Sequence, residues 1–215
     1  MPDARAILPL ALLLAGPATG LAPAVAGATG AWTTYQRAQQ HTDVLVRGDT
    51  VWLASSEAAL QRFPRATGAF EVIAREPGRL ASHALSVLEF DRSGRLWIGT
   101  EDAGVSRLSA DGRAWDLVSQ LDGLPAGPVN VLRAVGDTLL IGTDNGIALW
   151  DGDEIAGTVP EGVNPSPLPS NAVTGAVLSG DSLWLATRKG LVVSRASTGL
   201  ATWTLADPLF ANVEV

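Results

Sequence analysis

A short segment recurs four times along the chain at nearly even spacing. In each copy a turn glycine or aspartate is followed, three residues later, by a large apolar side chain. These side chains are Trp52, Trp97, Leu140 and Trp184, at steps of 45, 43 and 44 residues. Repeats with a period of about 40–45 residues are typical of arrays whose unit is four short strands. The period constrains the fold more than any other feature of the sequence.

Each repeat is predicted to form four short strands. In the second repeat we expect them at 85–90, 95–99, 105–108 and 114–119, joined by turns rich in aspartate and glycine. Second strands such as 96–98 are apolar on successive residues, which predicts that both faces of each sheet are covered. The sequence therefore predicts an all-β chain, a β-propeller with about four four-stranded blades of an incomplete ring. A β-sandwich would have strands without this repeat.

The composition excludes several classes of protein. Hydrophobic residues make up 47% of the 215 residues and charged residues 17%, which excludes a mainly disordered chain. The formal net charge is −7, so the chain lacks the basic surface that nucleic-acid binding requires. Cysteine is absent, which excludes disulfides, cysteine nucleophiles and thiolate metal sites.

Residues 1–26 are predicted to be a signal peptide. Arg5 precedes an apolar run at 7–15, and the small residues at 24–26 fit a cleavage site. An uncleaved anchor is the alternative, but the run is too short to span a bilayer and Gly16 and Pro17 interrupt it. We therefore expect an exported chain, periplasmic, cell-surface or secreted, whose mature part does not insert into a membrane.

The rest of the chain divides into two unequal parts. Residues 27–41 are predicted to supply the outer strand of a closing blade, because the run around Trp32 resembles the last strand of later repeats. Residues 42–215 are predicted to form the blades, and residues 211–215 resemble the beginning of a fifth. Rings of such repeats usually have ~6 to 8 blades. We therefore expect the N-terminal fragment of a longer propeller, with the remaining blades of its own chain as partners.

Two stretches carry a resemblance to a known repeat family. Residues 124–132 read Leu-Pro-Ala-Gly-Pro-Val-Asn-Val-Leu and are followed by Leu-Ile-Gly-Thr at 140–143 and Asn-Gly-Ile at 145–147. Residues 168–173 begin a similar series. These stretches resemble the two-component-regulator propeller repeat of bacteria. The resemblance covers about residues 42–215, is closest in the second repeat, and is weakest in the first, where Ala59 replaces a glycine.

This resemblance implies both a fold and a biological setting. Propellers of that family commonly form the exported sensory part of histidine kinases, and they also occur in secreted or cell-surface proteins without a kinase. The resemblance implies no particular ligand.

Aromatic side chains are candidates for stacking on sugars or bases. Their constant spacing favours packing between blades instead. The residues expected to pack are Trp52, Trp97 and Trp184 in second strands, Trp150 in a third strand, and Trp32, Phe70, Trp115 and Trp203 in last strands.

The sequence assigns no catalytic, cofactor-binding or metal-binding residue. One hydroxyl recurs in each repeat, which favours a turn hydrogen bond over a nucleophile; the set is Ser55, Thr100, Thr143 and Thr187. A catalytic triad would need His41 or His83, the only histidines, and both are expected in links before first strands.

Two acidic stretches are further candidates for sites. Residues 151–154, Asp-Gly-Asp-Glu, match a calcium loop poorly and are predicted to form a hairpin turn. Glu101 and Asp102 are adjacent in sequence, and adjacent carboxylates rarely converge on one glycosidic bond, so a solvated turn is expected.

We therefore expect a non-enzymatic, exported ligand-binding or sensory β-propeller, the extracytoplasmic part of a signalling or cell-surface protein. Its partner would be a small molecule, a glycan or a protein, held by loops at one end of the ring or in the central opening. No cofactor and no nucleic acid is expected. The alternative is a secreted hydrolase or lyase whose active site lies in blades outside this sequence.

Overall fold

The computed structural model describes residues 40–160, 168–200 and 202–206. The predicted signal peptide, the strand around Trp32 and the predicted fifth blade lie outside the described residues. Within them the chain forms four antiparallel sheets of four strands each, which are propeller blades and are here called blades A to D.

Blade A contains β1 (His41–Arg47), β2 (Thr50–Ser55), β3 (Leu60–Pro64) and β4 (Glu71–Ile73). Blade B contains β5 (Leu85–Phe90), β6 (Leu96–Thr100), β7 (Val105–Leu108) and β8 (Trp115–Val118). Blade C contains β9 (Val129–Val135), β10 (Thr138–Thr143), β11 (Gly146–Trp150) and β12 (Ile155–Pro160). Blade D contains β13 (Val173–Ser179), β14 (Ser182–Thr187), β15 (Gly190–Arg195) and β16 (Thr204–Leu205).

The observed strands agree closely with the sequence prediction. In blade B the strands β5 and β7 have the predicted bounds, β6 is shifted by one residue, and β8 is one residue shorter at each end. The sequence prediction is wrong for His41 in blade A, because His41 is the first residue of β1 and not part of a link. Its backbone is already paired, opposite Ser55 of β2.

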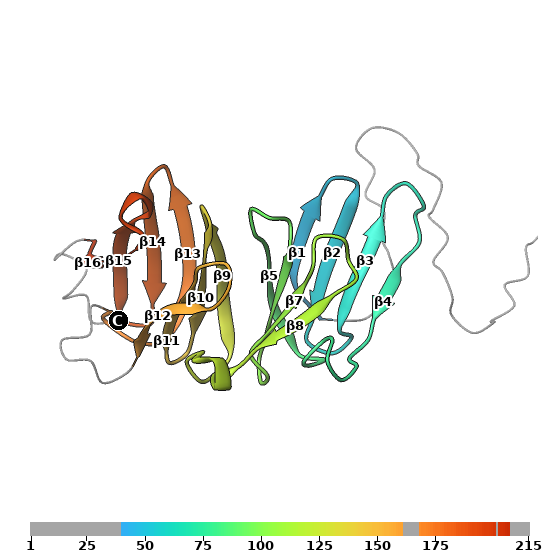
Figure 1. Ribbon diagram of the computed structural model, residues 1–215, viewed down its shortest axis with the longest axis horizontal. Helices are drawn as coiled ribbons and strands as arrows, with labels where there is room; N and C mark the ends of the chain where they lie inside the picture. Colours follow the sequence, from blue (N-terminus) through green and yellow to red (C-terminus); the bar gives the residue numbers. More distant parts are fainter. Residues whose placement is uncertain (1–39, 161–167, 201, 207–215) are drawn as a thin grey trace, which may run out of the picture.

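Every blade is a meander whose strand order follows the sequence. The first strands are neighbours, with β1 beside β5, β5 beside β9 and β9 beside β13. Figure 1 shows the blades in sequence order, with the last strands β4 and β16 at the two far ends of the described part. The first strands therefore line a common inner side, as expected for part of a propeller ring.

The hydrophobic core is divided into three parts, one between each pair of neighbouring blades. We call the position of Trp52, Trp97, Leu140 and Trp184 in their blades the repeat position. In each part of the core, the side chain at the repeat position of one blade packs with the two residues that flank this position in the next blade. These sets are Trp52 with Leu96 and Ile98, Trp97 with Leu139 and Ile141, and Leu140 with Leu183 and Leu185. Successive residues of β6 and β10 thus point to opposite, buried faces. The prediction that these sheets are covered on both sides is confirmed.

Trp184 departs from the prediction that it packs in a blade core. Its side chain is 36% exposed, whereas Trp97 at the same repeat position is 0% exposed. The reason is its direction, because Trp184 lies on the face of blade D that points away from blade C. No other sheet in the described part of the chain covers that face.

The other aromatic side chains that the structure describes pack as predicted, although Phe70 and Trp203 come just before the last strands β4 and β16. Trp150 is buried and meets Trp97 edge to face, with 5.3 Å between ring centroids. Phe70 lies 4.7 Å from the ring of Phe63. Trp115 and Trp203 are partly buried at the margins of cores.

The turn between second and third strands requires a left-handed backbone. Gly104 has a φ of 78° in blade B, and Ala59 has a φ of 64° in blade A. Ala59 in the first repeat therefore adopts the same left-handed conformation that Gly104 has at this position in the second repeat. A left-handed conformation costs an L-residue roughly 1–2 kcal/mol, so blade A carries this strain.

Replacing Gly104 with alanine should lower the free energy of unfolding by about 2–3 kcal/mol. A Cβ at Gly104 would lie 2.4 Å from the carbonyl oxygen of Val118, in addition to its left-handed φ. Gly112→Ala is the matched control, because Gly112 has a φ of 73° and open space around it. Urea denaturation should show a loss of about 1–2 kcal/mol for this control. Equal losses in the two variants would mean that the close contact of the new Cβ with the Val118 carbonyl oxygen does not change the free energy of unfolding.

Candidate functional site

The recurring hydroxyls are parts of turns, as predicted. Thr100 Oγ1 donates to the carbonyl of Gly104 at 2.8 Å and accepts from the backbone N–H of Ala103 at 2.9 Å. Thr187 Oγ1 donates to Gly190 in the same way. Each hydroxyl is buried and fixes the turn after the second strand. This use of the oxygen accounts for its recurrence without a catalytic role.

The predicted hairpin at 151–154 is confirmed. The Asp151 carboxylate accepts from the backbone N–H groups of Asp153 and Glu154, both at 3.1 Å. These hydrogen bonds lower the pKa of Asp151, because they favour its charged form. The carboxylate therefore closes the β11–β12 turn.

The histidines and acidic side chains do not gather into a metal cluster in the part of the chain that the structure describes. His41 and His83 are both exposed. Among the described residues no helix has the length and apolar composition needed to cross a membrane.

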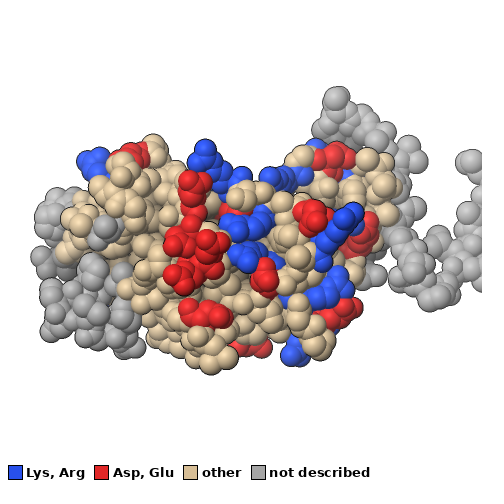
Figure 2. Space-filling view, viewed as in Figure 1, with Lys and Arg blue, Asp and Glu red and all other residues tan. Residues whose placement is uncertain are grey.

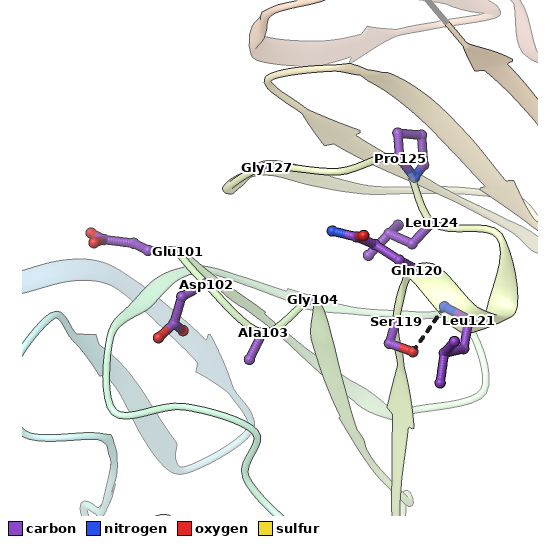
Figure 3. Close-up of a pocket in the computed structure, with 10 residues that line it drawn as sticks. All are labelled: Glu101, Asp102, Ala103, Gly104, Ser119, Gln120, Leu121, Leu124, Pro125 and Gly127. Atoms are coloured by element: carbon purple, nitrogen blue, oxygen red, sulfur yellow. Dashed lines mark hydrogen bonds between the residues drawn. The ribbon is translucent and has the colours of Figure 1, made fainter.

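A pocket of about 400 Å³ opens between the ends of blades B and C, and we call it the loop pocket. One wall is the β6–β7 turn and the other is the link between β8 and β9 (Figure 3). Its lining residues are Glu101, Asp102, Ala103, Gly104, Ser119, Gln120, Leu121, Leu124, Pro125 and Gly127.

The link is held in place by a local cap and a core anchor. Ser119 caps the short 3₁₀ helix η1 (Gln120–Asp122), and the Asp122 carboxylate accepts from the Ser119 backbone N–H at 2.8 Å. Gly123 then reverses the chain with a φ of 94°. Leu124 is buried in the core between blades B and C. This anchor fixes the link against both blades, so the pocket wall is preformed.

The loop pocket combines acidic and apolar groups. Glu101 and Asp102 lie on one side of the opening, and Gln120 lies on the other (Figure 3). Both carboxylates are exposed, as predicted for a solvated turn. Leu121 in the link is 98% exposed. Such a surface can accept hydrogen bonds from hydroxyl or ammonium groups and can contact an apolar ring face.

A second hollow of about 400 Å³ lies along the first strands, on the inner side of the blades. Its charged groups already join one blade to the next. The Arg133 guanidinium lies 3.5 Å from the Glu89 carboxylate and donates to the Ala176 carbonyl at 3.3 Å. Asp43 accepts from the backbone N–H of Leu88 at 2.8 Å.

The electrostatics of this inner hollow fit a structural role. Burial raises the pKa of Glu89, the Arg133 charge opposes that rise and the Asp43 charge adds to it. Figure 2 shows acidic and basic side chains side by side over the middle of the visible face. Within the hollow, Glu89 of blade B forms an ion pair with Arg133 of blade C.

The sequence predicts Glu101 and Asp102 only as a solvated turn, and it gives no indication of the opposite wall of the pocket. The capping pattern of Ser119 and Asp122, three residues apart, was a readable signal for the 3₁₀ helix. Nothing in the local sequence placed this link beside the β6–β7 turn, because that depends on how blades B and C pack.

Comparison with solved structures supports the fold. The extracellular domain assigned to the hybrid two component system BT3049 of B. thetaiotaomicron is 19% identical with a TM-score of 0.60, over 80% of this chain and 22% of that one. The extracellular domain of BT4673 from the same organism is 12% identical with a TM-score of 0.64, over 84% of this chain and 24% of that one. An ancestral GH74 enzyme is 14% identical with a TM-score of 0.57, over 79% of this chain and 24% of that one.

These likenesses concern the fold, and the chain spans less than a quarter of the length of each of these three proteins. No family model matches the sequence, and no curated protein matches it significantly.

Proposed function

We propose that the chain is a non-enzymatic ligand-binding or sensory module that acts outside the cytoplasm and is built from two-component-regulator propeller repeats. The observation that carries the proposal is the shared fold with extracellular domains of two-component proteins. The family resemblance of residues 42–215 and the signal peptide expected at 1–26 point the same way. The compartment would be the periplasm, the cell surface or the medium.

The loop pocket is the proposed binding site. Its wall is held by the buried Leu124 and the Ser119 cap, so little ordering would be needed when a ligand binds. Its exposed carboxylates and the Gln120 amide suit a small molecule or glycan that presents hydroxyl or ammonium groups. The exposed Leu121 would contact an apolar face of the same ligand.

The proposal that the module is not an enzyme has its own support. General acid–base and nucleophilic catalysis require a nucleophile, a base or paired carboxylates that converge. In the described part of the chain the recurring hydroxyls are committed to turns, and the Asp151 carboxylate closes a hairpin.

Removing the charge of the pocket should weaken ligand binding at least tenfold. Hydrogen bonds to charged groups contribute about 1.5–3 kcal/mol each, and every 1.4 kcal/mol is tenfold in affinity. The chain is first screened by thermal shift against neutral oligosaccharides, amino sugars and polyamines. Isothermal titration then compares the chain with its Glu101→Gln/Asp102→Asn variant.

The control variant is Asp153→Asn/Glu154→Gln, which removes the same charge from an exposed turn. That turn joins β11 to β12 and lies at the opposite end of the strands from the β6–β7 turn. Its affinity should equal that of the unchanged chain. A ligand bound equally well by both double variants would exclude the loop pocket as its site.

A further inference from the structure

Each first strand contains a β-bulge at an equivalent residue of its repeat. The pairing register of β1 with β2 skips one residue between His41 and Asp43, and the other three blades repeat this shift. A bulge turns the extra side chain away from the regular alternation of the strand. In every blade this side chain is polar; the bulged residues are Thr42, Ser86, Asn130 and Thr174.

At the three junctions between described blades, the bulged side chain bonds to the next blade. The Ser86 hydroxyl donates to the Val129 carbonyl. Thr42 Oγ1 donates to the Leu85 carbonyl at 2.8 Å, and Asn130 Nδ2 donates to the carbonyl of the first residue of β13 at 2.9 Å. Each acceptor is the first residue of the next first strand. We call this hydrogen bond the blade latch.

The latch between blades B and C lies in a tightly packed place. Opposite the bulge, β6 has Gly99, and a Cβ built there would lie 2.8 Å from Val129 Cγ1 and 3.1 Å from Ser86 Oγ. A residue larger than glycine would therefore push Val129 or Ser86 away. The start of β9 thus lies directly on blade B, and the Ser86 hydrogen bond holds it there.

This latch lies at the base of the loop pocket. Ser86 comes two residues after Ala84, whose carbonyl accepts from the backbone N–H of Glu101 at 3.0 Å where the β6–β7 turn begins. Val129 comes two residues after Gly127, the last residue of the link that lines the pocket. The latch therefore joins the root of one pocket wall to the end of the other. The described residues that line the pocket do not include Ser86.

The link is also held at its middle and at its end. At its middle, Leu124 Cδ2 lies 3.4 Å from the place of a Cβ built on Gly104 of blade B. At its end, Asn130 Nδ2 donates to Asp144 Oδ1 at 2.8 Å, but this hydrogen bond stays within blade C. Among the described residues, the Ser86 latch is the one hydrogen bond between residues 125–130 and blade B. It is therefore the polar contact that fixes the end of the link relative to the β6–β7 turn.

We propose that Ser86 is a positioning residue of the loop pocket, which sets the spacing of the pocket walls through its hydrogen bond to Val129. Because Ser86 does not line the pocket, it acts on a bound molecule only through the position of the walls. Removing its hydroxyl should raise the population in which the end of the link is detached from blade B by about 3- to 10-fold, as for the loss of one neutral hydrogen bond. The effect of Ser86 on ligand affinity rests on the proposed function, whereas the spacing of the walls does not.

Nitroxide labels on the two walls test the positioning role without a ligand. The chain has no cysteine, so Asp102→Cys and Leu121→Cys in one molecule place one label on the turn and one on the link, at exposed residues. Electron paramagnetic resonance then measures the distribution of the distance between the labels. Ser86→Ala should broaden this distribution or shift it to longer distances. Ser86→Thr should leave it unchanged, because Thr42 makes the same hydrogen bond in blade A.

The matched control is Thr42→Ala, which removes the equivalent latch between blades A and B. The distance distribution of this control should equal that of the labelled chain without it. Hydrogen exchange, followed by mass spectrometry, should accelerate about 3- to 10-fold over residues 119–130 in Ser86→Ala and stay unchanged there in Thr42→Ala. Circular dichroism shows that each variant is folded.

Unchanged label distances and unchanged exchange in Ser86→Ala would overturn the positioning role, and so would an equal change in Thr42→Ala. A Ser86→Thr variant that behaves like Ser86→Ala would also overturn it, because the hydroxyl would then not be what holds the link. A thermal-shift screen that finds no ligand would contradict the proposed function but not the spacing of the walls.

Discussion

Replacing Trp97 with alanine should lower the free energy of unfolding by about 3–5 kcal/mol, as for a large aromatic side chain in a core. Trp97 is completely buried between blades B and C. Its ring meets Trp150 edge to face, and its indole N–H donates to the Asp91 carboxylate at 2.8 Å. The substitution removes the ring contacts and leaves a cavity between two sheets. Urea denaturation of the variant and the unchanged chain measures the loss.

The matched control is Trp184→Ala, at the same repeat position in blade D. Trp184 is 36% exposed and keeps part of its packing, so its truncation should cost less, about 1–2 kcal/mol. A loss under about 1 kcal/mol for Trp97→Ala, or equal losses for the two variants, would contradict the division of the core between blades.

The comparison of Trp97 with Trp184 also marks what the sequence could predict. The spacing of the repeat position identified the second strands and the inward direction of their side chains. It could not distinguish Trp97 from Trp184, because the two have nearly identical neighbours in sequence. Burial depends on whether another sheet lies against the face, which is a property of the assembled blades and not of the local segment.

The bulged residues illustrate the same limit at finer scale. The repeat alignment placed Thr42 and Ser86 in equivalent first strands, but their period gave no sign that they lie outside the regular alternation. A bulge becomes visible only in the pairing register of two strands. The loop pocket has a similar origin, because its walls come from separate segments that meet through the packing of Leu124 between blades.

The sequence predicts Asp91 only as a turn residue. In the structure its carboxylate accepts hydrogen bonds from both Arg95 and Trp97 of blade B. Its side chain is 11% exposed and lies 2.6 Å from Arg95 Nε. The carboxylate also accepts from the Arg95 backbone N–H at 3.0 Å and from the Trp97 indole N–H at 2.8 Å. Burial acts to raise the pKa of Asp91, but the hydrogen bonds from Trp97 and Arg95 outweigh it and lower that pKa.

Asp91→Ala should therefore lower the free energy of unfolding by about 3–4 kcal/mol at neutral pH, since it leaves the Trp97 indole N–H without its acceptor inside the protein. Asp91→Asn keeps the size of the side chain and one acceptor oxygen, so its loss should be smaller, about 2 kcal/mol. Urea denaturation at pH 7 compares the two variants with the unchanged chain.

The pH dependence of this loss separates the charge of Asp91 from its shape. A carboxylate whose pKa is lower in the folded state contributes stability above its unfolded pKa of about 3.9, and that contribution disappears as the pH falls through the folded pKa. The difference in stability between the unchanged chain and Asp91→Asn should thus be constant from neutral pH down to about pH 5 and shrink below about pH 4. Measurements at a series of pH values follow this difference. A difference that stays the same throughout acidification would mean that Asp91 stabilises blade B by shape and not by its charge.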